Sequence, residues 1–84
     1  MNEATAQIFE TLKRNIVAVL PDLADHSFVM SDQLVELGAN SVDRADIVMT
    51  TMDELGLRIP RTELAGARNL GDLVNVFSRH SAGK

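Results

Sequence analysis

The chain has 84 residues, of which 45% are hydrophobic and only 4% aromatic, and it contains no Cys, Trp or Tyr. This composition predicts a single domain over residues 1–84 with an aliphatic, helical core, and it excludes disulfides and thiolate metal ligands. Twelve acidic and eight basic residues give a net charge of −4. Nucleic-acid binding is therefore not expected, because it needs clustered Lys and Arg, whereas basic protein partners are plausible.

No part of the sequence indicates a membrane or secretory segment. The longest apolar run, residues 16–20, is far shorter than a membrane span, and Glu3 and Glu10 do not fit a secretory signal. We therefore expect a cytoplasmic protein that does not bind membranes.

A first helix is predicted from about Glu3 to Leu20, ended by Pro21. Its buried face consists of apolar residues at helical spacing: Ile8, Leu12, Ile16 and Val19, flanked by Phe9 and Leu20. Residues 21–40 carry scattered apolar side chains without sustained periodicity, so we expect a long loop pinned to the core. Long loops in compact domains are usually functional.

The second helix is predicted over Ser41 to about Leu55, with Gly56 as its C-terminal cap. Residues 60–65 are expected to form one short helical turn, and a last helix to begin after a capping Asn69. That helix should bury Leu70, Leu73, Val74 and Phe77, and residues 78–84 should form a frayed tail. The predicted fold is an all-α four-helix bundle, with three main helices, one short helix and a long first loop.

The second helix has an unusually wide apolar face. An arc of about 140° contains Leu55, Val48, Met52, Ala45, Met49 and Val42, and Ile47 widens it to about 220°. A small bundle buries only part of this arc. Val42 and Met49 lie at its edge beside Asp46 and Asp53, which predicts a partly exposed apolar strip rimmed by acids. The alternative is that the methionines fill gaps in the core and the acids form an ordinary solvated face.

Residues 37–43, Leu-Gly-Ala-Asn-Ser-Val-Asp, place Ser41 at the start of this helix. Asn40 can cap the helix, and an anion on Ser41 would be favoured by the backbone amides and the helix dipole. The alternative is that Ser41 is only part of a cap. His26 and His80 are distant in sequence and form no recognisable triad with Ser41, and no pattern of metal ligands is present. The residues therefore give no sign that Ser41 is a catalyst, and their spacing alone does not separate an attachment point from a simple cap.

This stretch closely resembles the Leu-Gly-x-Asp-Ser-Leu signature of acyl carrier proteins, although Asn40 replaces the usual Asp and Val42 the usual Leu. The resemblance continues through residues 59–60, Ile-Pro, and residues 70–74, Leu-Gly-Asp-Leu-Val. It implies a covalent 4′-phosphopantetheine on Ser41, whose thiol replaces the Cys that the chain lacks. It also implies that the second helix docks a phosphopantetheinyl transferase and partner enzymes, and that magnesium is shared with the transferase. The implied contact residues are Val42, Asp43, Ala45, Asp46, Met49, Asp53 and Glu54.

A narrower resemblance covers residues 40–47, which look like the free-standing carrier proteins of bacterial polyketide pathways that make β-branches. Arg44, a positive charge in the acidic face, is its clearest mark. The implied partners are an acyltransferase, a ketosynthase-like enzyme that decarboxylates malonyl to acetyl, and an enzyme resembling hydroxymethylglutaryl synthase that takes the acetyl. We hypothesise that Arg44 helps this enzyme separate donor from acceptor carriers. The alternative is an exposed Arg44 paired with neighbouring acids.

Two other functions fit the same pattern. The chain could carry acyl groups for fatty-acid or ordinary polyketide extension, or it could be an unmodified helical interaction module in which Ser41 is only a cap. No nucleophile and base pair, cofactor loop or metal set indicates an enzyme. The family resemblance implies a monomer.

Overall fold

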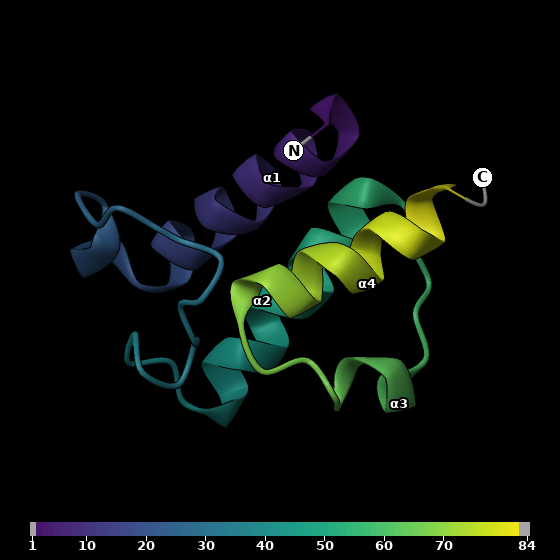
Figure 1. The fold of residues 1–84 in the computed structure, drawn as a ribbon. Coiled ribbons are helices and arrows are strands. Elements are labelled where there is room, and N and C mark those ends of the chain that lie inside the picture. Colours follow the sequence, from purple (N-terminus) through teal and green to yellow (C-terminus); the bar gives the residue numbers. More distant parts are fainter. Residues whose placement is uncertain (1, 83–84) are drawn as a thin grey trace.

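The computed structural model describes residues 2–82 and is helical throughout its regular elements (Figure 1). The elements are α1 (Glu3–Val19), the short 3-10 turn η1 (Pro21–Leu23), α2 (Ser41–Leu55), α3 (Arg61–Leu64) and α4 (Leu70–Ala82). α1 packs against both α2 and α4, and α3 lies against α4. The predicted all-α bundle, with three main helices and one short helix, is confirmed.

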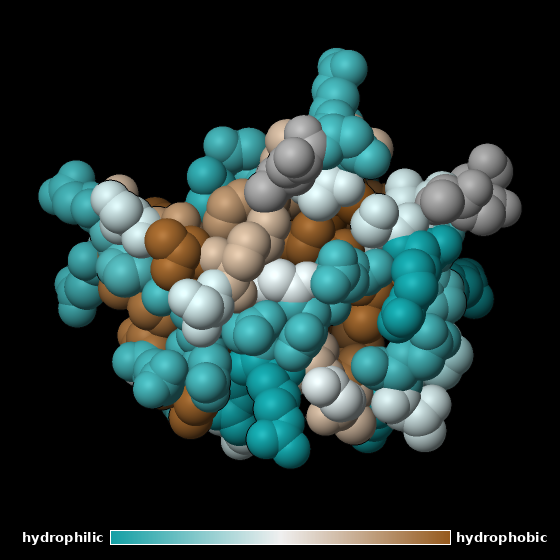
Figure 2. All heavy atoms as spheres, viewed as in Figure 1, coloured by the Kyte–Doolittle hydropathy of each residue, from teal (hydrophilic) through white to brown (hydrophobic). Residues whose placement is uncertain are grey.

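α1 begins where the side chain of Asn2 accepts a hydrogen bond from the backbone N–H of Thr5 at 2.8 Å. The helix ends at Val19, and the next residue but one is Pro21, as the sequence predicts. The buried core gathers large side chains from all three long helices, among them Leu12, Ile16, Ile47, Leu70 and Phe77. The face drawn in Figure 2 is mostly hydrophilic, with hydrophobic side chains showing between polar ones.

The loop between α1 and α2 is fastened to the start of α4. The backbone N–H groups of Leu70 and Gly71 donate to the carbonyl oxygens of Asp32 and Met30, each at 2.9 Å. These bonds satisfy amides in the first turn of α4, which have no acceptor within the helix. The predicted loop pinned to the core is therefore confirmed, and Leu34 is its most buried hydrophobic anchor apart from Ala39.

The buried side of α2 differs from the prediction. Ile47, expected at the margin of the apolar arc, is 0% exposed. Thr51 is also 0% exposed, although it is polar and was therefore not included in the predicted buried face. The Thr51 hydroxyl donates to the carbonyl of Ile47 at 2.7 Å and accepts from Nδ2 of Asn15 at 2.9 Å. Because these bonds satisfy the hydroxyl, a polar residue can lie at the centre of the buried face.

Asn15 and Arg14 of α1 also hold Glu54 of α2. Asn15 Nδ2 donates to one carboxylate oxygen of Glu54 at 2.7 Å, and Arg14 Nη2 binds the other at 2.6 Å. The hydrogen bond from Asn15, together with that from Arg14 and its charge, holds the pKa of Glu54 below its usual range. Glu54, a predicted partner contact, is therefore paired with α1, although it remains exposed.

The predicted frayed tail is wrong for its first five residues, because α4 continues to Ala82. His80 Nε2 lies 3.0 Å from both carboxylate oxygens of Glu63 on α3, and Arg79 lies 3.8 Å from one of them. These contacts favour an ordered last turn. Residues 83–84 lie outside the described part of the chain. Within residues 2–82, no helix is both long and apolar enough to cross a bilayer.

Candidate functional site

The turn before α2 sets the position of Ser41. Gly38 has a φ of 103°, in the left-handed region that favours glycine, and the chain then turns into the helix through the buried Ala39. Asn40 Oδ1 accepts from the backbone N–H of Asp43 at 2.8 Å, and the Asp43 carboxylate accepts from the backbone N–H of Asn40 at 3.2 Å. This reciprocal capping box fixes Ser41 as the first residue of α2.

The side chain of Ser41 is exposed, and its hydroxyl forms no hydrogen bond with any residue of the described chain. Both histidines are paired elsewhere, His26 with Asp32 and His80 with Glu63, each at 3.0 Å. A phosphate ester fits at this position because the hydroxyl is accessible and lies at the positive end of the helix dipole. The geometry leaves the hydroxyl of Ser41 accessible to an external enzyme.

An exposed strip runs along α2 from this serine. We call Val42, Ala45, Asp46, Met49 and Asp53 the acid-rimmed strip. All five residues are exposed, and the two largest apolar side chains, Val42 and Met49, are 74% and 64% exposed. The predicted strip is confirmed, and the alternative that Met49 fills the core is wrong. That alternative is correct for Met52, which packs against the core.

Arg44 lies on a different side of α2. Its Nη1 donates to the carbonyl of Ala39 at 2.8 Å, and the side chain is half-buried. It forms no ion pair with any carboxylate among residues 2–82, so the expected alternative of an exposed surface pair is wrong. The bond to Ala39 instead ties the first turn of α2 to the preceding loop.

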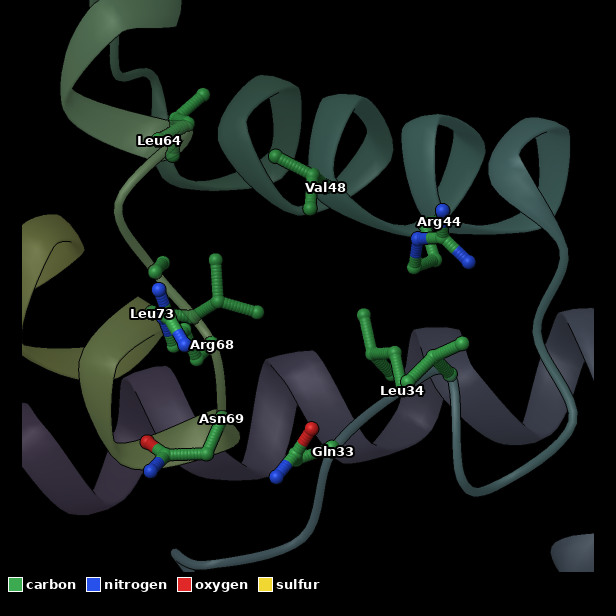
Figure 3. A pocket seen from close by; sticks show the side chains of 10 residues that line it. Gln33, Leu34, Arg44, Val48, Leu64, Arg68, Asn69 and Leu73 are labelled. Carbon is green, nitrogen blue, oxygen red and sulfur yellow. The ribbon is translucent and has the colours of Figure 1, made fainter.

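Arg44 also lines a cavity of about 490 Å³, which we call the arginine pocket (Figure 3). α2 forms one wall, and the α1–α2 loop, α3 and the start of α4 form the others. The lining residues are Gln33, Leu34, Val35, Arg44, Val48, Leu64, Ala67, Arg68, Asn69 and Leu73. A neighbouring apolar groove of about 630 Å³ between α2 and α3 shares Arg44, Val48 and Leu64 with it.

The arginine pocket could not be predicted from the sequence, because its walls come from four separate segments. No single helix pattern joins Gln33, Arg44 and Arg68. The only signal in the sequence was Arg44 itself, a basic residue in an otherwise acidic helix.

Residues 11–77 match the family model described as the phosphopantetheine attachment site. The chain belongs to the acyl carrier protein family. Family membership identifies its cofactor as a covalently attached 4′-phosphopantetheine, as the sequence resemblance implied. In the structure of this carrier protein, an exposed serine, Ser41, lies at the capped start of α2.

Two curated relatives and one solved structure are similar to this carrier protein. The polyketide biosynthesis acyl-carrier-protein AcpK of Bacillus subtilis is 54% identical over 84% of this chain and 87% of its own length. An acyl carrier protein of Clostridium perfringens is 30% identical over 88% of this chain and 97% of its own. A chain in the crystal structure of the curacin pathway HMG synthase in complex with acetyl donor-ACP is 39% identical. It superposes with a TM-score of 0.84, over 94% of this chain and 99% of that one.

Proposed function

We propose that this protein is a donor carrier, which holds a malonyl-derived acetyl group as a thioester and delivers it to a hydroxymethylglutaryl-synthase-like enzyme for β-branching. The 4′-phosphopantetheine is attached at Ser41. The exposed, capped position of this serine at the start of α2 carries the proposal. The likeness to a structure that contains an acetyl donor carrier supports the donor role.

The chain positions the attachment site without supplying reactive groups of its own. The capping box between Asn40 and Asp43 holds the backbone at Ser41, and both histidines are committed to other carboxylates. A phosphopantetheinyl transferase must therefore activate the hydroxyl, and the protein itself is not an enzyme. When bound, the group supplies the thiol that forms the thioester. Asn40 caps as well as the family's Asp but adds no charge beside the serine.

The acid-rimmed strip is the proposed docking surface for the transferase, an acyltransferase, a decarboxylating ketosynthase and the synthase-like enzyme. Its exposed Val42 and Met49 supply apolar contact, while Asp46 and Asp53 attract basic partners. Asp43 lies beside the strip and adds to its charge, whereas Arg44 lies on a different side of the same first turn. We place this single-domain carrier in the cytoplasm as a monomer, so that the strip stays free for successive partners.

The donor role can be tested by loading the protein with acetyl and mixing it with a synthase-like enzyme from a β-branching pathway. Loss of the acetyl group from the carrier is followed by intact mass. An acetyl-loaded carrier of fatty-acid type, such as the Clostridium perfringens relative, is the control. Transfer from this protein should be at least about tenfold faster, a difference of about 1.4 kcal/mol in the barrier. Equal rates would favour a carrier for ordinary chain extension.

The same assay tests Arg44. Arg44→Glu should slow acetyl transfer to the synthase-like enzyme, because it reverses the one positive charge on this part of α2. Unchanged transfer by this variant would remove Arg44 as a residue that distinguishes donor from acceptor carriers.

A further inference from the structure

We infer that the arginine pocket binds the terminal carboxylate of a short dicarboxylic acyl group, such as malonyl, carried on the protein's own arm. The pocket then retains the acyl end before decarboxylation and releases it once the carboxylate is lost. This inference rests on the proposed attachment at Ser41. It assigns the pocket a ligand class and places it between loading and transfer.

The distribution of cations points to an anionic ligand. The side chains of Arg14, Arg79 and Lys13 each pair with a glutamate, whereas those of Arg44, Arg58, Arg61 and Arg68 form no ion pair among residues 2–82. Arg68 meets a carboxylate only through its backbone N–H, which donates to Asp72 at 3.0 Å. Arg44 and Arg68 line the arginine pocket, and Arg61 lines the adjoining groove. No acidic residue lines either space. In a chain of net charge −4, unpaired positive charge is thus gathered on one side of α2.

The rim of the pocket presents hydrogen-bond donors. Arg44 uses Nη1 on the carbonyl of Ala39, which orients the guanidinium and leaves its other N–H groups available. Asn69 uses Oδ1 to accept from the backbone of Asp72, so its Nδ2 remains a donor. Arg68 and Gln33 complete the rim. Guanidinium groups bind carboxylates through paired, charge-assisted hydrogen bonds, which makes a carboxylate the best matched anion of small size.

Part of the pocket lining is apolar, which suits a short acyl chain. Leu34, Val48, Leu64 and Leu73 supply it, and Figure 3 shows them among the polar side chains. The volume of about 490 Å³ lies within the range of about 300–1,000 Å³ common for small-ligand sites. A neutral acetyl group would contact this apolar lining but offer no anion to the arginines, so it would be held less well.

Because the acyl group is tethered near the arginine pocket, even a weak affinity for its carboxylate is sufficient for binding. Ser41 and Arg44 are three residues apart on α2, so they lie one above the other on neighbouring turns. A group tethered by a short flexible arm has an effective concentration in the mM range. A pocket whose dissociation constant for the carboxylate is also about 1 mM would therefore be about half occupied. Such binding is also weak enough to yield to a docked enzyme.

The test compares arms that differ in one group. The protein labelled with ¹⁵N is loaded with malonyl, with acetoacetyl, which places a methyl where malonyl has a carboxylate oxygen, or with acetyl. Nuclear magnetic resonance follows the arginine Nε–H signals and the backbone amides around Gln33 and Asn69. We expect malonyl to shift the signals of Arg44 and Arg68 at least about threefold more than either neutral group, because only malonyl brings an anion.

Variants assign the shifts to the pocket. Arg68→Gln, at an exposed side chain whose loss should not affect folding, should reduce the malonyl-specific shifts by at least half, and Arg44→Gln should do the same. Arg58→Gln removes an unpaired arginine that lines neither space and should leave them unchanged. Equal shifts from malonyl and acetoacetyl, or malonyl shifts outside the pocket, would overturn the inference. Failure of the arm to load on Ser41, seen by intact mass, would instead overturn the proposed function and this inference with it.

Discussion

The two sides of α2 differ in shape, charge and origin. The acid-rimmed strip is exposed and built from one helix, with Asp46 and Asp53 beside apolar side chains, and its Ala45 and Met49 also line the groove between α2 and α3. The arginine pocket is concave and built from several segments, and Arg44 and Arg68 line it together with apolar side chains. On the two proposals made above, the two sides of this short helix have different roles. An enzyme docks on the strip, while the arginine pocket beside it holds a small anion.

The largest expected effect is on the free energy of unfolding, which should depend on residues of the buried side of α2 and hardly on residues of the strip. Ile47→Ala removes a side chain that is 0% exposed and should lower the free energy of unfolding by about 2–5 kcal/mol. Met49→Ala, at a side chain that is 64% exposed, should change it by less than about 0.5 kcal/mol. Urea denaturation followed by circular dichroism measures both, since the chain has no Trp or Tyr. Equal losses would show that the two sides are assigned wrongly.

The next largest effect concerns the polar contacts that fasten α2 to α1. Asn15→Ala deprives Thr51 and Glu54 of a donor and should lower the free energy of unfolding by about 1–3 kcal/mol. Thr50→Ala is the matched control on the exposed side, where the hydroxyl lies 3.4 Å from Asp46, and it should have little effect. A stable Asn15→Ala variant would mean that the apolar core alone holds α2 in place.

Docking on the strip should respond to a change that leaves the fold intact. Met49→Gln keeps the length of the side chain but removes apolar contact, and acetyl transfer to the synthase-like enzyme should fall about tenfold. Val29→Asn, at a side chain of the loop that is 50% exposed, is the control and should transfer normally. Similar losses in both variants would indicate that the strip is not the docking surface.

The smallest effect tests the loop wall of the pocket. The backbone N–H of Val29 and the side chain of His26 hold the pKa of Asp32 below its usual value. A lowered pKa stabilises the fold above the unfolded value of about 3.8, and this stabilisation is lost as the pH falls through the lower, folded value. Asp32→Asn should therefore cost about 0.5–1.5 kcal/mol at pH 7.

The measurement for Asp32 is a series of denaturation curves at falling pH. The difference between wild type and Asp32→Asn should shrink below about pH 3.8, as the wild-type carboxyl takes up its proton. A difference that stays constant with pH would show that the charge of Asp32 does not stabilise the loop.

Much of the fold could be predicted because local signals coincide with its ends. Asn40 and Gly56 mark the two ends of α2, and Pro21 follows the end of α1. Thr51 could not be placed in the core, because its burial depends on a hydrogen bond from Asn15, far away in the sequence. The last turn of α4 was missed for a similar reason, since its partner Glu63 lies on α3.

In the candidate site, too, the features set by local sequence could be predicted, and those set by contacts between distant segments could not. The position of Ser41 and the exposure of Val42 follow from the pattern of one helix and its cap. The hydrogen-bond partner of Arg44 could not be predicted from the sequence. Helical spacing indicates acidic residues on the same face as partners, whereas the observed partner is the backbone carbonyl of Ala39. Recognition of the pocket needed the three-dimensional arrangement of the loop, α3 and α4 around that arginine.

The most direct test of the account is intact mass after incubation with coenzyme A, magnesium and a broad-specificity phosphopantetheinyl transferase. Wild type and Ser27→Ala, which alters an exposed serine of the loop, should each gain a single phosphopantetheine. Ser41→Ala should gain none while remaining folded. An addition that persists in Ser41→Ala, or no addition to folded wild type by an active transferase, would contradict Ser41 as the attachment point.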